Sequence, residues 1–251
     1  MARGRAKLAI SQGVSVWVLE ALDGFGDAEV HAHHAIQISL CLSGALALVG
    51  AGKTVRASGI AVAADFPHRL EAQGLMAFIF VEPESRVGRA LRQGLLGQDS
   101  MRAFDTTAME THLERLRATF VAGLDVETLL DAAREAVNVL APGAPALLPD
   151  PRIQKIIDYA NAHLDEPLSL AEASAGVHLS PSRLRHLFVE QTGLAFKTYM
   201  LWLRLVRAVQ VYSEGQSLTE AAHAAGFSDS AHFSRVFRRT FGTPATHLTR
   251  L

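Results

Sequence analysis

The chain has 251 residues, of which 49% are hydrophobic and 20% are charged, a balance that predicts a folded globular protein of one large or two ordinary domains. The single cysteine, Cys41, excludes an intramolecular disulfide, and no apolar run is long enough for a membrane span or a signal peptide, so we expect a cytoplasmic protein without a membrane partner. The formal net charge of −1 conceals a mild asymmetry, because residues 150–251 carry 11 Lys and Arg against 9 Asp and Glu, whereas residues 1–149 have a net charge of −3.

Residues 14–81 have the pattern of β structure, because short runs rich in β-branched and aromatic residues alternate with glycine and proline at close intervals. Closely spaced strands without helical spacers predict an antiparallel sandwich or barrel. We expect turns at the glycines between the runs, among them Gly44. The expected strands cover residues 14–19, 36–42, 45–49, 59–63 and 76–81.

Two amphipathic helices are predicted after the strands. Residues 107–120 and 126–140 each place hydrophobic residues at intervals of three and four along one stripe. These helices have two interpretations that the sequence leaves open. Either they only cover the sheet, or they also supply the contact of a homodimer, which we favour.

A linker is predicted at residues 141–149, because three prolines and one glycine within nine residues cannot continue a helix and bury little surface. It separates an amino-terminal domain, residues 1–140, from a carboxy-terminal domain, residues 150–251. Asp150 and Pro151 then have the pattern of an N-cap followed by the first residue of a helix.

The stretch at residues 218–241 has the pattern of two short helices joined by a tight turn. Hydrophobic residues recur at three and four up to Gly226, where a residue that tolerates positive φ lets the chain turn. Ser228 or Asp229 can cap the second helix, which carries arginines away from its apolar face. This is the pattern of a helix-turn-helix motif, whose second helix enters the major groove of DNA.

The same pattern occurs twice. Residues 168–191 parallel residues 217–241, with Gly176 lying 50 residues before Gly226. A long helix is predicted between the two units, from residue 196 to about residue 213. The repeat therefore predicts two helix-turn-helix units in one domain.

Five segments of the carboxy-terminal region resemble the DNA-binding domain of AraC-type transcription regulators. They read Leu-Ser-Leu at 168–170, Leu-Ser-Pro-Ser-Arg-Leu at 179–184, Leu-Arg-Leu-Val-Arg-Ala at 203–208, Gly-Phe-Ser-Asp at 226–229 and His-Phe-Ser-Arg-Val-Phe at 232–237. The resemblance covers residues 150–251. It implies an all-α domain of seven helices with two helix-turn-helix motifs that read adjacent segments of the major groove.

The resemblance also implies which side chains contact DNA. Arginine is suited to the guanine edge, and phosphate contacts set the register without reading sequence. Arg183, Arg204 and Arg207 are left open between DNA contact and a structural or surface role, and Ala231 offers only an apolar contact. The expected base contacts are Ser182, Arg185, His186, Ser230, Ala231, Ser234 and Arg235. The expected phosphate contacts are Ser180, Lys197, Arg238, Arg239 and Thr243.

A second resemblance, to the motifs of cupin domains, lies in the segment His-Ala-His-His-Ala-Ile-Gln at 31–37, followed by Gly44 and by Pro67-His68. It implies a β-barrel, although Gln37 stands where an acid is usual and Asp65 where glycine is common. If residues 31–41 are extended, alternate side chains, those of His31, His33, Gln37, Ser39 and Cys41, point to one face.

Two interpretations of this face stay open. His31, His33 and His68 could bind a divalent metal, with Gln37 as a poor fourth ligand. Alternatively, the face lines a pocket for an organic effector, and no cofactor is required. The expected effector residues are Trp17, Gln37, Ser39, Cys41 and His68.

The sequence therefore predicts a two-domain α+β protein, with a cupin-like β-barrel and two trailing helices before the helix-turn-helix domain. We expect a transcription regulator, not an enzyme, whose partners are double-stranded DNA, a small-molecule effector, a second copy of the chain and RNA polymerase. The alternative is a metal-dependent cupin enzyme with an accessory helical domain. No nucleophile with its base and no phosphate-binding loop is found to support it.

Overall fold

The computed structural model describes residues 6–11, 14–21, 29–123, 125–142, 150–164, 168–192, 194–242 and 244–245. The chain divides into two compact units, one of residues 1–146 with residues 237–251 and the other of residues 147–236. Most of the predicted linker lies outside the described residues. None of the described helices combines the length and apolar character that a membrane span requires.

The amino-terminal part of the chain forms a seven-stranded sheet in the order β1-β2-β6-β3-β5-β7, with β4 paired to β3, and every pairing is antiparallel. The strands are β1 (Ala6–Ser11), β2 (Val14–Ala21), β3 (Ile36–Gly50), β4 (Lys53–Arg56), β5 (Gly59–Val62), β6 (Arg69–Val81) and β7 (Met101–Phe104). The predicted barrel is corrected here. Among the described residues the sheet is not closed, because its order begins at β1 and ends at β7 and these two strands do not pair.

One strand replaces two predicted ones. The sequence placed a turn at Gly44, but β3 runs straight through it for 15 residues. The chain changes register at an irregularity between Cys41 and Ser43, and Gly44 lies opposite Gly74 of β6. Both glycines have positive φ, 95° and 100°, and an added Cβ on either would meet the backbone of the partner strand, so the glycines mark a close approach of two paired strands rather than a turn.

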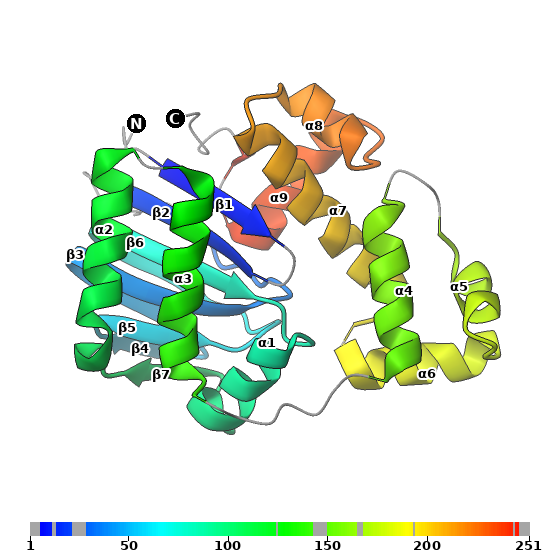
Figure 1. The fold of residues 1–251 in the computed structure, drawn as a ribbon, viewed down its shortest axis with the longest axis horizontal. Helices are drawn as coiled ribbons and strands as arrows, with labels where there is room; N and C mark the ends of the chain where they lie inside the picture. Colours follow the sequence, from blue (N-terminus) through cyan, green and yellow to red (C-terminus); the bar gives the residue numbers. More distant parts are fainter. Residues whose placement is uncertain are drawn as a thin grey trace. The chain divides into compact units, whose positions relative to one another are not determined.

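Two helices, α2 (Glu110–Ala122) and α3 (Val126–Leu140), run across one face of the sheet (Figure 1), which confirms both helix predictions. α2 packs against β3, and α3 packs against β1 and β2. Strand and helix side chains form one buried hydrophobic core, in which each fully buried side chain removes apolar surface from water. Its members include Val16, Val18, Ile36, Ile38, Leu40, Ala77, Ile79, Leu113, Leu116, Phe120, Leu129, Ala133 and Val137.

The segment between the sheet and α2 contains α1 (Arg86–Ala90), a π-helical turn η1 (Leu91–Leu96) and a 3₁₀ turn η2 (Thr107–Met109). Ser85 caps α1 by accepting a hydrogen bond from the Gly88 amide at 2.9 Å. After α1 and η1 the chain returns to the sheet as β7, which pairs with β5.

The carboxy-terminal region is helical throughout its described elements. These are α4 (Pro151–Ala162), α5 (Leu170–Gly176), α6 (Pro181–Thr192), α7 (Phe196–Ser213), α8 (Leu218–Ala224) and α9 (Ser230–Phe241). The predicted start of α4 is confirmed, since Asp150 accepts from the Arg152 amide with Pro151 in the first turn. The predicted long helix is confirmed as α7. Its buried side includes Tyr199, Leu203 and Val209.

Candidate functional site

The sheet has a second face, opposite α2 and α3, that we call the inner face and define by Trp17, Gln37, Ser39, Met76, Phe78 and Phe80. The strand register brings its side chains into rows. Phe78 lies between Trp17 and Ser39, and Phe80 lies opposite Gln37. All six side chains are buried. Four of them are large and mainly apolar, and the other two, Gln37 and Ser39, are polar. This is the composition of small-molecule sites.

The indole N–H of Trp17 has no hydrogen-bond partner among the described residues, although the side chain is only 5% exposed. Leaving a buried donor unpaired costs free energy, so such a group calls for an explanation. The Trp17 ring lies edge-on to Phe80, with centroids 5.1 Å apart. Of the other predicted effector residues, Cys41 is half-buried, and burial raises the pKa of its thiol, which suits a packing residue.

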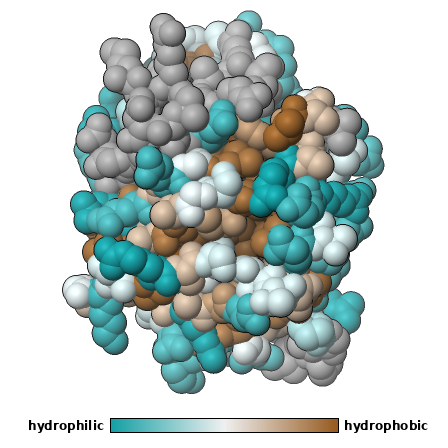
Figure 2. All heavy atoms as spheres, turned by 90° about the vertical axis from the view of Figure 1, so that its left-hand side faces the viewer, coloured by the Kyte–Doolittle hydropathy of each residue, from teal (hydrophilic) through white to brown (hydrophobic). Residues whose placement is uncertain are grey.

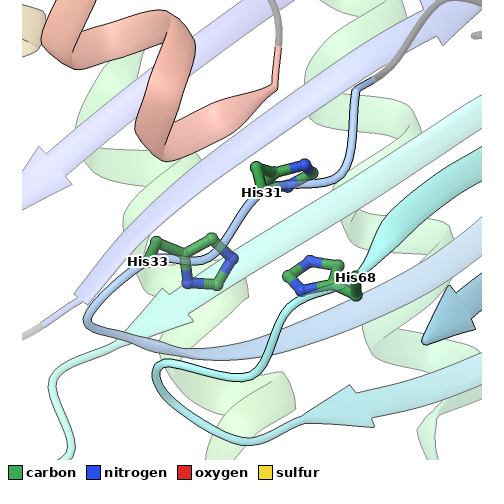
Figure 3. A group of neighbouring side chains, drawn as sticks. All are labelled: His31, His33 and His68. Carbon is green, nitrogen blue, oxygen red and sulfur yellow. The ribbon is translucent and has the colours of Figure 1, made fainter. Parts of the chain in front are cut away.

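The three imidazole rings of the histidine triad, His31, His33 and His68, lie close together beside the sheet (Figure 3). His31 and His68 form an isolated antiparallel bridge, in which each backbone amide donates to the other residue's carbonyl at 2.9 Å. One potential ligand nitrogen from each ring lies within 4.8 Å of those from the other two. The predicted grouping of the three imidazoles is therefore present. The extended backbone on which the alternation argument depended begins only at Ile36, with β3.

Backbone carbonyls hold all three rings by Nδ1. The partners are the carbonyl oxygens of Glu29 for His31 at 2.8 Å, Ala35 for His33 at 3.1 Å and Phe66 for His68 at 2.8 Å. The side-chain oxygen of Gln37 faces the Nε2 atoms of His33 and His68, at 2.8 and 3.3 Å. The Gln37 amide nitrogen donates to Ser39 Oγ at 2.8 Å. Gln37 thus links the triad to the inner face.

Burial makes the triad neutral at ordinary pH. Desolvation, helped by the charges of the neighbouring imidazoles, lowers the pKa of His33 to about 3 and that of His68 to about 4. Desolvation also lowers the pKa of His31. Neutral imidazoles can act as metal ligands without first losing a proton.

His34 belongs to a different cluster, which the sequence did not reveal. Its Nδ1 lies 3.2 Å from Asp65 Oδ2, and its Nε2 lies 3.2 Å from Glu84 Oε2. Burial opposes the charge on His34, but the hydrogen bonds to the two carboxylates outweigh it and raise the pKa of His34 to about 9. His34 is therefore a buried cation with one buried and one half-exposed carboxylate partner.

In the helical region, two short helices are followed by longer ones, α5 by α6 and α8 by α9. Both short helices begin with the same capping box, Ser169 with Glu172 and Ser217 with Glu220. The predicted turn glycine, Gly226, has a φ of 73°. Of the two predicted caps, Asp229 is the one used, because its Oδ1 accepts from the His232 amide at 2.6 Å.

The predicted DNA-contacting side chains lie away from the buried side of these helices. On α6, Leu184, Leu187 and Phe188 are buried and the predicted residues are exposed, and on α9 the buried residues include Phe233 and Val236. Thr243 lies outside the described residues. The exposed predicted residues are Ser180, Ser182, Arg185, His186, Lys197, Ala231, Arg235, Arg238 and Arg239, while Ser230 and Ser234 are half-buried.

Two of the arginines left open by the sequence have local partners. Arg204 is half-buried, and its Nε donates to the Leu164 carbonyl at 3.2 Å, which gives it a structural contact. Arg207 is exposed and donates to Gln210 on its own helix at 3.1 Å. The Arg183 side chain is exposed, and its backbone amide donates to the Ser180 hydroxyl, which caps α6.

A short capped helix, a tight turn and a second helix with exposed arginines have the arrangement of a helix-turn-helix motif. Residues 173–250 match the family model of a helix-turn-helix domain. This match confirms the expected helix-turn-helix domain in the carboxy-terminal region, and the curated relatives of the chain are named as HTH-type transcriptional regulators.

Two curated relatives show how far the similarity extends. The HTH-type transcriptional regulator GbdR of Pseudomonas aeruginosa (strain UCBPP-PA14) is 36% identical over 95 residues, which cover 38% of this chain and 26% of GbdR. The uncharacterized HTH-type transcriptional regulator YpdC of Escherichia coli (strain K12) is 31% identical over 144 residues, covering 56% of this chain and 50% of YpdC. The matches thus span between a quarter and a half of these relatives.

Solved structures extend the likeness to the whole fold. ToxT from Vibrio cholerae O395 superposes with a TM-score of 0.59 and 13% identity, covering 94% of this chain and 96% of ToxT. A structure of ToxT from Vibrio cholerae strain SCE256 with an unsaturated fatty acid bound gives a TM-score of 0.56 at 13% identity, covering 95% of this chain and 96% of that one. At this identity the likeness concerns the fold alone.

Proposed function

We propose that the whole chain is a transcription regulator that binds double-stranded DNA through both helix pairs and senses a small molecule through the sheet. The observation that carries the DNA-binding part is the repeated arrangement of a capped short helix followed by a helix with exposed basic residues. The test is a binding selection with the full chain at physiological salt. No sequence preference, or no loss of affinity with rising salt, would refute this function.

Arg235 and Arg238 distinguish base reading from phosphate contact. Replacing Arg235 by alanine is expected to cost about 1–3 kcal/mol of binding free energy and to relax preference at one base pair, because a bidentate contact to guanine is lost. Replacing Arg238 is expected to weaken binding to all sequences alike and to reduce the salt slope by about one. Fluorescence anisotropy on a set of single-base operator variants measures both effects.

The control is Arg207→Ala, which removes an exposed arginine whose local partner lies on its own helix α7. This variant is expected to bind every operator variant as the wild type does. A uniform loss across all base pairs with Arg235→Ala would assign Arg235 to the phosphates instead.

The effector is proposed to bind at the inner face. The Trp17 N–H, which has no partner in the part of the chain that the structure describes, and the buried rings of Phe78 and Phe80 suit a molecule with an apolar body and one hydrogen-bond acceptor. The bound fatty acid in a ToxT structure is a molecule of this kind in a protein of the same fold.

A thermal-shift screen of apolar carboxylates and other small metabolites tests this proposal, since a ligand of the native state raises the melting temperature. For any such ligand, Trp17→Phe removes the N–H and keeps an aromatic ring. We expect it to weaken binding by about 0.5–1.5 kcal/mol, whereas Trp202→Phe on α7 leaves the affinity unchanged. Equal affinities of the Trp17→Phe variant and the wild type would exclude the indole as a donor to the effector.

The regulator is proposed to act as a homodimer through α2 and α3, beside RNA polymerase at a promoter. On α2, Val121 is 65% exposed, and apolar residues show among hydrophilic ones on the side of the molecule seen in Figure 2. Size-exclusion chromatography of the full chain, with light scattering of the eluted protein, measures the mass of the particle in solution. The mass of a single chain at the concentrations used for DNA binding would contradict the dimer.

A further inference from the structure

We propose that the histidine triad, with the side-chain oxygen of Gln37, is a binding site for a divalent transition-metal ion of the zinc and nickel type. The proposal rests on the sensor role proposed for the sheet and adds a chemical class of ligand to it. It concerns four described residues, His31, His33, Gln37 and His68, whose polar atoms converge from the segment before β3, from β3 itself and from the segment before β6 (Figure 3).

The backbone fixes two of the rings before any ion arrives. The His31 and His68 main chains are joined by two hydrogen bonds of 2.9 Å, which sets the distance between their side chains. Their ring centroids are 4.5 Å apart, and that of His33 lies 5.1 Å from His68. A site held by paired backbone loses little conformational entropy when it binds a ligand.

The Nδ1 contacts decide which nitrogen of each ring is available. A carbonyl oxygen can only accept a hydrogen bond, so a ring whose Nδ1 lies beside a carbonyl is best satisfied with its proton on Nδ1. This holds for all three rings of the triad. Their Nε2 atoms then carry lone pairs. Histidine metal ligands characteristically donate their other ring N–H in this way, which fixes the tautomer and the ring orientation.

Gln37 adds a fourth candidate ligand. With the proton on Nδ1, the lone pairs of His33 Nε2 and His68 Nε2 both face the Gln37 oxygen, at 2.8 and 3.3 Å. Acceptors facing one another at this distance in a buried place repel. A cation among them turns every one of these lone pairs into a favourable contact. The repulsion would also be relieved without an ion if the Gln37 side-chain amide were turned by 180°. Its NH₂ group would then donate to the two rings, and its oxygen would accept from the Ser39 hydroxyl.

The donor set selects the kind of ion. Three imidazoles and an amide oxygen carry no charge and match zinc, nickel, cobalt and copper, whereas calcium and magnesium require several hard oxygen ligands. Acids near the triad do not complete the set, because Asp65 and Glu84 are both engaged by His34 and the Glu29 carboxylate pairs with Arg238. Metal–nitrogen bonds of about 2.0–2.1 Å at tetrahedral angles bring ligand atoms to about 3.4 Å of one another. Small ring rotations from the present spread of up to 4.8 Å would achieve this.

The test is metal titration of the full chain, purified without metal, with Zn²⁺, Ni²⁺ and Co²⁺ by calorimetry. Binding of one ion per chain and an intense tetrahedral Co²⁺ absorption spectrum are expected. His33→Ala and His68→Ala are each expected to weaken binding by more than about 100-fold, since even indirect partners of a metal contribute 10–100-fold. Gln37→Glu is expected to tighten binding about tenfold or more, because it adds a negative charge beside the ion.

The matched control is His178→Asn. His178 is an exposed histidine with a φ of 55°, a conformation that asparagine tolerates, so its loss should leave metal binding unchanged. Circular dichroism of each variant confirms folding, and Gln37→Glu keeps the test decisive even where a histidine variant fails to fold.

Absence of stoichiometric metal binding to the wild type would refute the site and support the turned amide of Gln37. Binding that Gln37→Glu does not tighten would overturn the four-ligand set. Sequence-specific DNA binding is measured on the same samples, so failure of the metal site and failure of the regulator function are distinguished.

Discussion

Replacing Gly74 by alanine is expected to cost at least about 1–3 kcal/mol of unfolding free energy from the backbone conformation alone, because Gly74 has a φ of 100°. The added Cβ also meets the Ser43 carbonyl oxygen at 2.3 Å. That oxygen belongs to the neighbouring strand, which cannot withdraw without breaking the longest pairing of the sheet, β3 with β6. We expect the sheet to lose its cooperative unfolding transition or to melt at a much lower temperature.

The matched control is Gly52→Ala. Gly52 also has positive φ, 73°, but a Cβ there meets nothing within 4 Å. Its replacement therefore reports the backbone term alone, about 1–2 kcal/mol. Urea denaturation of both variants, followed by circular dichroism, separates the two contributions. Equal losses for Gly52→Ala and Gly74→Ala would mean that the paired strands β3 and β6 separate easily at Gly74, contrary to the structure.

The Gly44 and Gly74 pair also shows where sequence reasoning reaches its limit for the fold. A glycine between two apolar runs is the usual sign of a turn, and only the partner strand shows that the chain continues there as a strand paired with β6. β1 lies before the first predicted strand, and β4 and β7 are edge strands of four residues with little hydrophobic pattern. The helices were predicted better, because caps and three-to-four periodicity are local signals.

For the candidate sites, residue alternation predicted that Gln37 and Ser39 share a face, and the structure agrees. The same alternation applied to residues 76–81 would have added Phe78 and Phe80. The approach of His68 to His31 depends on a pairing 37 residues apart, and only the cupin resemblance suggested it. His34 was missed because its partners, Asp65 and Glu84, are distant in sequence and carry no shared pattern.

The second large effect is expected at this missed residue. Replacing His34 by leucine should destabilise the sheet unit by about 3–5 kcal/mol, because it leaves the buried carboxylate of Glu84 without its charged partner. Glu84 is the critical partner, since Asp65 is half exposed and can be solvated by water. Burial of an unpaired carboxylate costs more than the pair itself contributes. The expected result is a fall in the midpoint of urea denaturation with an unchanged slope.

A double-mutant cycle shows that the charge, and not the shape of His34, is responsible. Glu84→Leu combined with His34→Leu removes both charges, so the double variant should recover much of the stability that the single His34 variant loses. His112→Ala is the matched control, because His112 makes a longer contact of 3.6 Å to a half-exposed carboxylate, Glu135, and should cost less than about 1 kcal/mol. If the losses of the two single variants simply add, His34 and Glu84 are not coupled, and the stability near the histidine triad comes from packing rather than from this buried ion pair.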